Sequence, residues 1–439
     1  MVIGKAMTAR YPSKIEAVAA KRAALGSFGD LGPGAPATGE WAALGLELPD
    51  VPAMRAWRLA RVREQLAARD YAAILVTDPI NTRYATDSTN MQVWCLHNPV
   101  RYAFVAADGP VIVFDFHGSA HLSAHLDLVD EMRPGRGWYF FNSGPRVAEH
   151  AVAWAAEIAD LLRAHGGGNR RLAIDNADHE GIAALQALGL SVHDGQEVME
   201  LARAIKSADE IKAMRCALAT TNAALRVMQS HLVPGITEQA LWAHLHHENI
   251  ARGGEWIETR LLASGPRTNP WFQECGSRAI EAGDLVAFDT DLIGPYGYCA
   301  DISRTWLCGE GPATEAQRTL YRIAREQIAH NLAQIRAGVS FREFSERAFV
   351  LPQRYRANRY STVVHGVGLC DEYPAIYYPE DAEETGYDGV LETSMTICLE
   401  SYVGEAGGPE GVKLEEQVLV TDTGAEVLSS YPFEDEALG

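Results

Sequence analysis

Residues 285–308 have the sequence LVAFDTDLIGPYGYCADISRTWLC, which predicts two apolar strands joined by a tight turn. Side chains two apart on a strand share a face, so Asp289 and Asp291 are expected together. We expect the turn to be centred on Pro295. That centre places Asp301 directly opposite Asp289 and one diagonal step from Asp291. Three carboxylates in one patch repel one another unless a cation lies between them, so this segment predicts a metal site.

A second predicted hairpin joins residues 395–402 (MTICLESY) to residues 413–420 (KLEEQVLV) across the Gly-rich loop 404–411. A hairpin centred in the middle of that loop places Glu400 opposite Glu415. The two predicted hairpins therefore repeat one arrangement, in which acidic side chains face each other from apolar strands.

The run VVHGVG, residues 363–368, lies between the hairpins and offers one histidine, His365, on a β-like segment. Five carboxylates and this imidazole could hold two divalent ions about 3.5–4 Å apart. Taken singly, an Asp-x-Asp pair is more often a solvated turn, and a lone histidine is more often structural. The joint pattern favours a metal centre, because acids in apolar strands such as VAFD and ICLE are costly to bury without a partner.

Composition limits the possible partners of the protein. The chain has 439 residues, 38 basic and 58 acidic side chains, and a formal net charge of −20. This charge argues against nucleic acid and against an acidic membrane surface. No apolar run approaches the roughly 18–20 residues of a membrane span, and the N-terminal residues interleave charges, so we expect a cytoplasmic protein. The seven scattered cysteines predict reduced, packed thiols.

Three regions are expected along the chain. Residues 1–50 form an N-terminal arm and linker, residues 51–205 an α/β domain, and residues 206–439 a second domain. The Pro/Gly/Ala-rich stretch 31–39 (LGPGAPATG) is expected to bend or extend without packing as a helix. Ser207 and Glu210 have the spacing of a capping box, which predicts that a long helix opens the second domain.

At these residues the sequence resembles the pita-bread superfamily of creatinase, prolidase, aminopeptidase P and methionine aminopeptidase. That group has an Asp, a second Asp about eleven residues later, a His in an H-G-x-G run, a Glu, and a final Glu before a V-L-V strand. The matching residues, in order, are Asp289 or Asp291, Asp301, His365, Glu400 and Glu415. The resemblance covers roughly residues 54–425. It implies a creatinase-like N-terminal α/β domain followed by a pseudo-symmetric α+β catalytic domain.

The sequence departs from the peptidases of that group at two places. Asp371 lies where they have a histidine several residues after the H-G-x-G run, and the run here is one residue shorter. Trp271 and Phe272 follow the stretch after which a further peptidase histidine is expected. Both imidazoles that assist peptide hydrolysis are missing, so amide cleavage is disfavoured although the metal ligands are kept.

A carboxylate beside a metal pair suits removal of a proton next to a substrate carboxylate, and this combination resembles the DddP-type dimethylsulfoniopropionate lyases. The resemblance implies Asp371 as the general base, and Trp94 and Tyr360 as substrate-positioning aromatics. It also implies a small zwitterionic substrate, a homodimer and two bound iron ions. An oxygen-rich site with one imidazole also accepts Mn, Co or Zn. The implied metal ligands are Asp289, Asp291, Asp301, His365, Glu400 and Glu415.

Two other functions remain open at this point. One is an aminopeptidase P-like, prolidase-like or creatinase-like metallohydrolase, and the other is a non-catalytic peptide-binding module that keeps the fold. The histidines His117, His121 and His125 are spaced for one helix face, which we interpret as an exposed or packed helix without a metal.

Overall fold

The computed structural model describes residues 12–25 and 32–439 of the chain. Contacts divide the described residues into two compact units: the first contains residues 12–25 and 50–203, and the second contains residues 32–49 and 204–439. Helix α2 (Pro12–Leu25) is part of the first unit. Within the described residues, no helix combines the length and the apolar character that crossing a bilayer requires.

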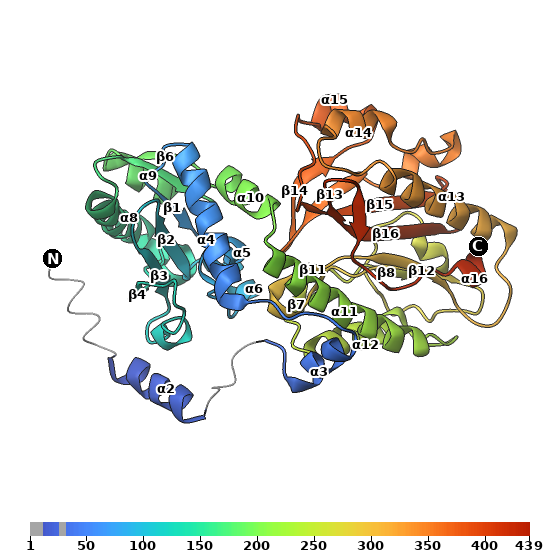
Figure 1. The fold of residues 1–439 in the computed structure, drawn as a ribbon, viewed down its shortest axis with the longest axis horizontal. Helices are drawn as coiled ribbons and strands as arrows, with labels where there is room; N and C mark the ends of the chain where they lie inside the picture. Colours follow the sequence, from blue (N-terminus) through green and yellow to red (C-terminus); the bar gives the residue numbers. More distant parts are fainter. Residues whose placement is uncertain (1–11, 26–31) are drawn as a thin grey trace. The chain divides into compact units, whose positions relative to one another are not determined.

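The first unit is built on a mixed six-stranded sheet in the order β4-β3-β2-β1-β5-β6 (Figure 1). Strands β1, β2 and β3 pair antiparallel, whereas β3–β4, β1–β5 and β5–β6 pair parallel. The central strands are buried throughout and pack with Trp154 and other apolar side chains into one core. The strands are β1 (Ala73–Val76), β2 (Tyr102–Ala106), β3 (Val111–Asp115), β4 (Glu131–Pro134), β5 (Arg171–Ile174) and β6 (Ser191–Asp194).

The helices of the first unit begin at residues that suit helix starts. Asp50 caps α4, because its side chain accepts a hydrogen bond from the Ala53 amide at 3.0 Å. Asp78 caps α5 in the same way through the amide of Ile80, at 2.7 Å. The helices are α4 (Val51–Ala68), α5 (Pro79–Thr86), α6 (Gln92–His97), α7 (Phe140–Ser143), α8 (Val147–His165), α9 (His179–Ala187) and α10 (Gln196–Ala204).

The second unit contains three sheets. Their strand orders are β14-β13-β15-β16-β17, β12-β9-β8 and β11-β10-β7. The strands are β7 (Trp256–Ile257), β8 (Leu262–Ser264), β9 (Leu285–Asp289), β10 (Leu292–Ile293), β11 (Cys299–Ala300), β12 (Ser303–Leu307), β13 (Val364–Val367), β14 (Asp371–Ile376), β15 (Thr396–Gly404), β16 (Gly411–Val420) and β17 (Ala425–Val427).

Helices α11 and α12 lie on one side of these strands and α13 lies on the other (Figure 1). The capping box predicted at Ser207 and Glu210 is present and begins α11. A second capping box, formed by Thr314 and Gln317, begins α13. The helices are α3 (Ala35–Ala43), α11 (Ala208–Ser230), α12 (Glu238–Ala251), α13 (Glu315–Leu332), α14 (Phe341–Arg347), α15 (Pro379–Thr385) and α16 (Asp435–Leu438).

The expectation that residues 31–39 do not form a helix is wrong, because α3 begins at Ala35 inside this stretch. Pro36 falls in the first turn, where its missing amide hydrogen costs nothing. Trp41 is 1% exposed and packs with Cys216 and Tyr296 of the second unit. Because this indole is buried against the second unit, the segment expected to be a linker is part of that unit.

The predicted register of the first hairpin is also wrong. Asp289 pairs with Ser303, two residues beyond Asp301. The turn is centred on Tyr296, because Pro295 begins a 3-10 turn in which Tyr296 has a φ of +61°. The second hairpin has the predicted register, with Glu400 opposite Glu415.

The predicted helix through His117, His121 and His125 is absent. Only a short 3-10 turn, Ala120–Leu122, forms within this segment of the first unit. Gly118, at a φ of +86°, interrupts any helix that would carry all three imidazoles on one face.

Candidate metal centre

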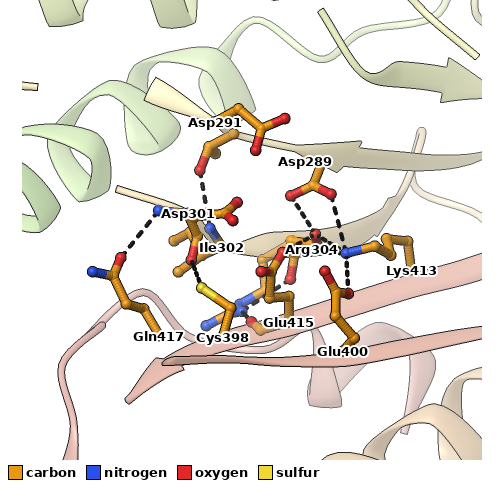
Figure 2. A network of polar contacts seen from close by, with 12 residues as sticks. Asp289, Asp291, Asp301, Ile302, Arg304, Cys398, Glu400, Lys413, Glu415 and Gln417 are labelled. Carbon is orange, nitrogen blue, oxygen red and sulfur yellow. Dashed lines mark hydrogen bonds and ion pairs between the residues drawn. The ribbon is translucent and has the colours of Figure 1, made fainter. Parts of the chain in front are cut away.

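All six side chains proposed as metal ligands converge inside the second unit. Three overlapping groups have potential ligand atoms within 4.8 Å of one another: Asp301, His365, Cys398 and Glu415; Asp289, Glu400 and Glu415; and Asp289, Asp291 and Asp301. Figure 2 shows the acidic side chains pointing toward one another from the two hairpins. The five carboxylates are at most 7% exposed. Sequence reasoning missed Cys398, which lies two residues before Glu400 on β15.

Local backbone geometry brings the three aspartates together despite the shifted register. Asp291 has a φ of +37°, so the chain kinks between β9 and β10 and turns this side chain into the cluster. The Thr259 hydroxyl donates a hydrogen bond to Asp291 Oδ2. The Asp301 amide donates to Gln417 Oε1 at 3.0 Å, which ties the first hairpin to β16.

A buried lysine, Lys413, lies inside the cluster and was missed by sequence reasoning. Its Nζ is 2.6 Å from Glu400 Oε2, 3.1 Å from Asp289 Oδ2 and 3.1 Å from Glu415 Oε2. The Ser303 hydroxyl accepts a further hydrogen bond from Nζ at 2.6 Å. Lys413 precedes Glu415 by two residues on β16, so period-two alternation of an apolar strand was the signal that could have found it.

The cluster carries more negative charge than Lys413 balances. Burial, and then the charge of Glu415, raises the pKa of Asp289 and that of Asp301 well above the usual range. Burial, and then the charge of Asp371, raises the pKa of Asp291 to about 6. Burial acts to raise the pKa of Glu415, but Lys413 and the neighbouring imidazole outweigh it, and the net shift is downward.

His365 is oriented by the strand that carries it. Its Nδ1 lies 3.1 Å from the Gly366 carbonyl oxygen, and its Nε2 lies 3.3 Å from Glu400 Oε1. Gly366 is required here, because a Cβ at this position would lie 2.3 Å from the Tyr373 carbonyl oxygen. Burial lowers the pKa of His365, but the surrounding carboxylates, Asp371 first, raise it well above its usual value.

Asp371, the predicted base, lies at the edge of the cluster and not within it. It begins β14, opposite Val367, and its side chain is 53% exposed. Its Oδ1 is 3.6 Å from His365 Nδ1. A carboxylate in this position is beside the buried acids and is also in contact with water.

The donor set fits divalent cations. Oxygen ligands with one imidazole suit first-row divalent metals, and carboxylates that bridge two ions are common in paired sites. The Asp301 Oδ1 atom is buried and accepts no hydrogen bond from any residue that the structure describes. Such an atom is costly unless a cation or a proton satisfies it. Lys413 alone does not neutralise the five carboxylates, so the charge of the cluster also calls for metal ions.

Three aromatic side chains, Tyr360, Trp271 and Phe272, lie beside the carboxylates. The Lys413 Nζ lies 4.7 Å from the centre of the Tyr360 ring and 6.0 Å from that of Trp271. Phe272 packs on Tyr360 with 5.2 Å between ring centroids. Trp94, the other predicted substrate-positioning aromatic, belongs to the first unit, where it packs on Phe116 at 4.8 Å.

Two family models match the chain. The Creatinase/Prolidase N-terminal domain matches residues 58–205, and metallopeptidase family M24 matches residues 212–422. The dimethylsulfoniopropionate lyase DddP of Roseovarius nubinhibens is 47% identical over 415 residues, which are 93% of each chain. The protein of the same name from Roseobacter denitrificans is 45% identical over 415 residues, again 93% of each chain.

Solved structures of similar fold are more distant in sequence. An Xaa-Pro dipeptidase from Bacillus anthracis aligns with a TM-score of 0.69 at 22% identity, over 86% of this chain and 98% of that one. A prolidase from Pyrococcus horikoshii aligns with a TM-score of 0.67 at 19% identity, over 86% of this chain and 99% of that one. These matches confirm the predicted fold class, a creatinase-like α/β domain followed by a pita-bread catalytic domain.

Proposed function

The chain belongs to the family of the DddP dimethylsulfoniopropionate lyases, within metallopeptidase family M24, and we propose that it is a metal-dependent carbon–sulfur lyase. Its substrate is dimethylsulfoniopropionate, and its products are dimethyl sulfide and acrylate. The observation that carries this proposal is Asp371, an exposed carboxylate 3.6 Å from the imidazole of a buried acidic cluster.

The metal centre is proposed to consist of two divalent ions, with iron as the first choice and Mn, Co or Zn as alternatives. The buried cluster and the unsatisfied Asp301 oxygen support this assignment. When bound, the ions would act as Lewis acids that neutralise the substrate carboxylate and make the adjacent carbon more acidic. The proposed ligands are Asp289, Asp291, Asp301, His365, Glu400 and Glu415.

Asp371 is proposed as the general base. Its carboxylate takes the proton from the carbon next to the substrate carboxylate. The electron pair of that C–H bond forms the double bond of acrylate, and the bond from the neighbouring carbon to sulfur breaks. Sulfur leaves with this bonding pair as neutral dimethyl sulfide. Because Asp371 is 53% exposed, it can pass the proton to water after each turnover.

Tyr360 and Trp94 are proposed to position the substrate. The position of Tyr360 beside Lys413 supports its assignment to the site. The rings of both residues offer apolar faces to the methyl groups of a sulfonium. Trp94 lies on α6, and its assignment rests on the likeness to the DddP lyases.

We also propose a cytoplasmic homodimer. Large apolar side chains are exposed on α6 and α7, among them Val93 (59%), Leu96 (57%), Phe140 (73%) and Phe141 (78%). A contiguous apolar surface patch marks a protein interaction site, and we propose that these side chains form one that binds a second copy of the chain. Analytical ultracentrifugation of the full chain tests this, and a monomer at micromolar concentration would contradict it.

Headspace analysis tests the proposed activity. Metal-loaded protein incubated with dimethylsulfoniopropionate should release dimethyl sulfide, and acrylate should accumulate in equal amount. Asp371→Ala should reduce release at least 100-fold, as expected for loss of a general base. The metal content of the variant should stay near that of the unaltered protein. Full activity in this variant would remove Asp371 from the mechanism.

The hydrolase alternative is tested in the same preparation. Turnover of an Xaa-Pro dipeptide without release of dimethyl sulfide would favour a prolidase-like enzyme. The exposed carboxylate in place of a peptidase imidazole argues against that result.

A further inference from the structure

The loop that carries Trp271 and Phe272 is anchored by hydrogen bonds beside the metal centre. Asn269 anchors its start, because its Nδ2 donates to the Glu405 carbonyl at 2.7 Å and to the Gly408 carbonyl at 2.9 Å. Its Oδ1 accepts a hydrogen bond from the Tyr402 hydroxyl at 2.9 Å. These bonds fix the loop on the second hairpin, which supplies Glu400 and Glu415.

The two aromatic residues of this loop have opposite environments. Trp271 is 6% exposed and stacks on Tyr402 with 6.0 Å between ring centroids, so it is part of the core. Phe272 is 56% exposed and has a φ of +72°. A bulky residue rarely adopts this backbone region, and strained positions of this kind cluster at binding sites. The strained backbone at Phe272 therefore holds a large apolar ring in contact with water.

A continuous set of contacts leads from Phe272 to the proposed metal ligands. Its ring lies 5.2 Å from Tyr360, at an interplanar angle of 34°. The Tyr360 ring lies 4.7 Å from Lys413 Nζ. Tyr360 thus already faces one cation, an ammonium that is bound by three carboxylates. Phe272 is the more exposed ring of this pair and offers a further aromatic face to a cation.

We infer that Phe272 is a specificity-determining residue that contacts the dimethylsulfonium group of the substrate. This inference rests on the proposed function. The positive charge of a sulfonium extends over its methyl groups, which pack well on an aromatic face. With two divalent ions bound, these ions and Lys413 balance the five buried carboxylates, so no net negative charge draws the cationic end of the zwitterion inward, and this end binds at the exposed ring. The carboxylate end is then left facing the metal centre.

The test compares two carboxylate ligands of similar size, one with a cationic end and one whose corresponding end is uncharged. The uncharged probe is 4-methylpentanoate, in which CH replaces the sulfonium sulfur, and the cationic probe is 3-(trimethylammonio)propionate. Calorimetry measures the Kd of each probe on the metal-loaded protein, and headspace assays measure KM for dimethylsulfoniopropionate. The variants are Phe272→Leu, Phe272→Gly and Phe272→Tyr, with Phe349→Leu as the control for loss of a ring elsewhere in the same unit.

Phe272→Leu should raise KM and the Kd of the cationic probe roughly 3- to 20-fold. The Kd of 4-methylpentanoate should change less than about 2-fold, and Phe272→Tyr should restore cation binding, because it keeps the aromatic face. Phe272→Gly should show the same loss as Phe272→Leu, and glycine suits the positive φ, so folding is not at risk. Phe349→Leu should leave all three constants unchanged.

Equal weakening of both probes would assign Phe272 a purely apolar or structural role and overturn the inference. Unchanged constants in Phe272→Leu and Phe272→Gly would overturn it as well. Failure of the proposed function is a separate result. In that case the unaltered, metal-loaded protein releases no dimethyl sulfide, whatever residue occupies position 272.

Discussion

Replacement of Lys413 by methionine removes the one ammonium that lies among three buried carboxylates. Lys413 Nζ is 2.6 Å from Glu400 and 3.1 Å from both Asp289 and Glu415, and the lysine is fully buried. Removal of one partner from a buried ion cluster typically costs about 3–5 kcal/mol. For a unit of this size that loss corresponds to a fall in Tm of about 6–20 °C in metal-free protein.

Bound metal should reverse much of this loss. Without the ammonium, the cluster is more negative by one charge, so divalent cations are attracted more strongly. The rise in Tm on metal loading should therefore be larger in Lys413→Met than in the unaltered protein. Lys413→Arg keeps the charge and should lose less stability than Lys413→Met.

Thermal unfolding followed by circular dichroism, with chelator or with added metal, measures both effects. Lys212→Met is the matched control, because this lysine forms ion pairs at the protein surface, with Glu47 at 3.2 Å and with Asp209 at 3.3 Å. Its removal should leave the Tm almost unchanged. A Lys413→Met protein whose metal-free Tm lies within 2 °C of the unaltered value would refute the placement of Lys413 inside the cluster.

Two further predictions concern the metal centre and the N-terminal arm. Burial and Asp371 raise the pKa of Asp291 to about 6, so this acid takes up a proton as the pH falls through 6. Protons then compete with metal, and metal content after dialysis should fall between pH 7 and pH 5, whereas full retention at pH 4.5 would contradict this. Trp41→Ala should destabilise the second unit by about 3–5 kcal/mol in urea unfolding, because the indole is 1% exposed. Leu44→Ala, at a residue that is 65% exposed, should change little, and equal losses in both variants would contradict the packing of α3.

The two hairpins show how far local pattern predicts a register. The loop between Glu400 and Glu415 connects two long strands that pair without a break, so symmetry about its centre gave the correct partners. The first hairpin is interrupted at Asp291, and Tyr296 extends its turn beyond Pro295. A shift of two residues keeps each side chain on its face, and for this reason the aspartates still meet.

The burial of Lys413 and the helix in the N-terminal arm could not be predicted without the tertiary structure. Strand alternation places Lys413 on the same face of β16 as Glu415, but the sequence does not show which carboxylates surround it. Asp289 of the first hairpin meets Glu400 and Glu415 of the second around this buried ammonium only in the folded protein. Pro and Gly in residues 31–39 argued against a helix, and packing of Trp41 on the second unit outweighed that local preference.

The sequence by itself determined the two-domain α/β fold and the family, and it supplied the six ligands and the general base that we propose. The order of motif residues and the alternation of apolar and polar side chains are local properties, so they can be read from the sequence without knowledge of tertiary packing. Only the tertiary structure decided which charges meet inside the protein, since the Lys413 ammonium, the strained Asp291 and the exposed Phe272 ring are products of packing between distant segments. Electrostatic energy depends on the distance between charges and on their burial, and the order of the residues alone gives neither quantity.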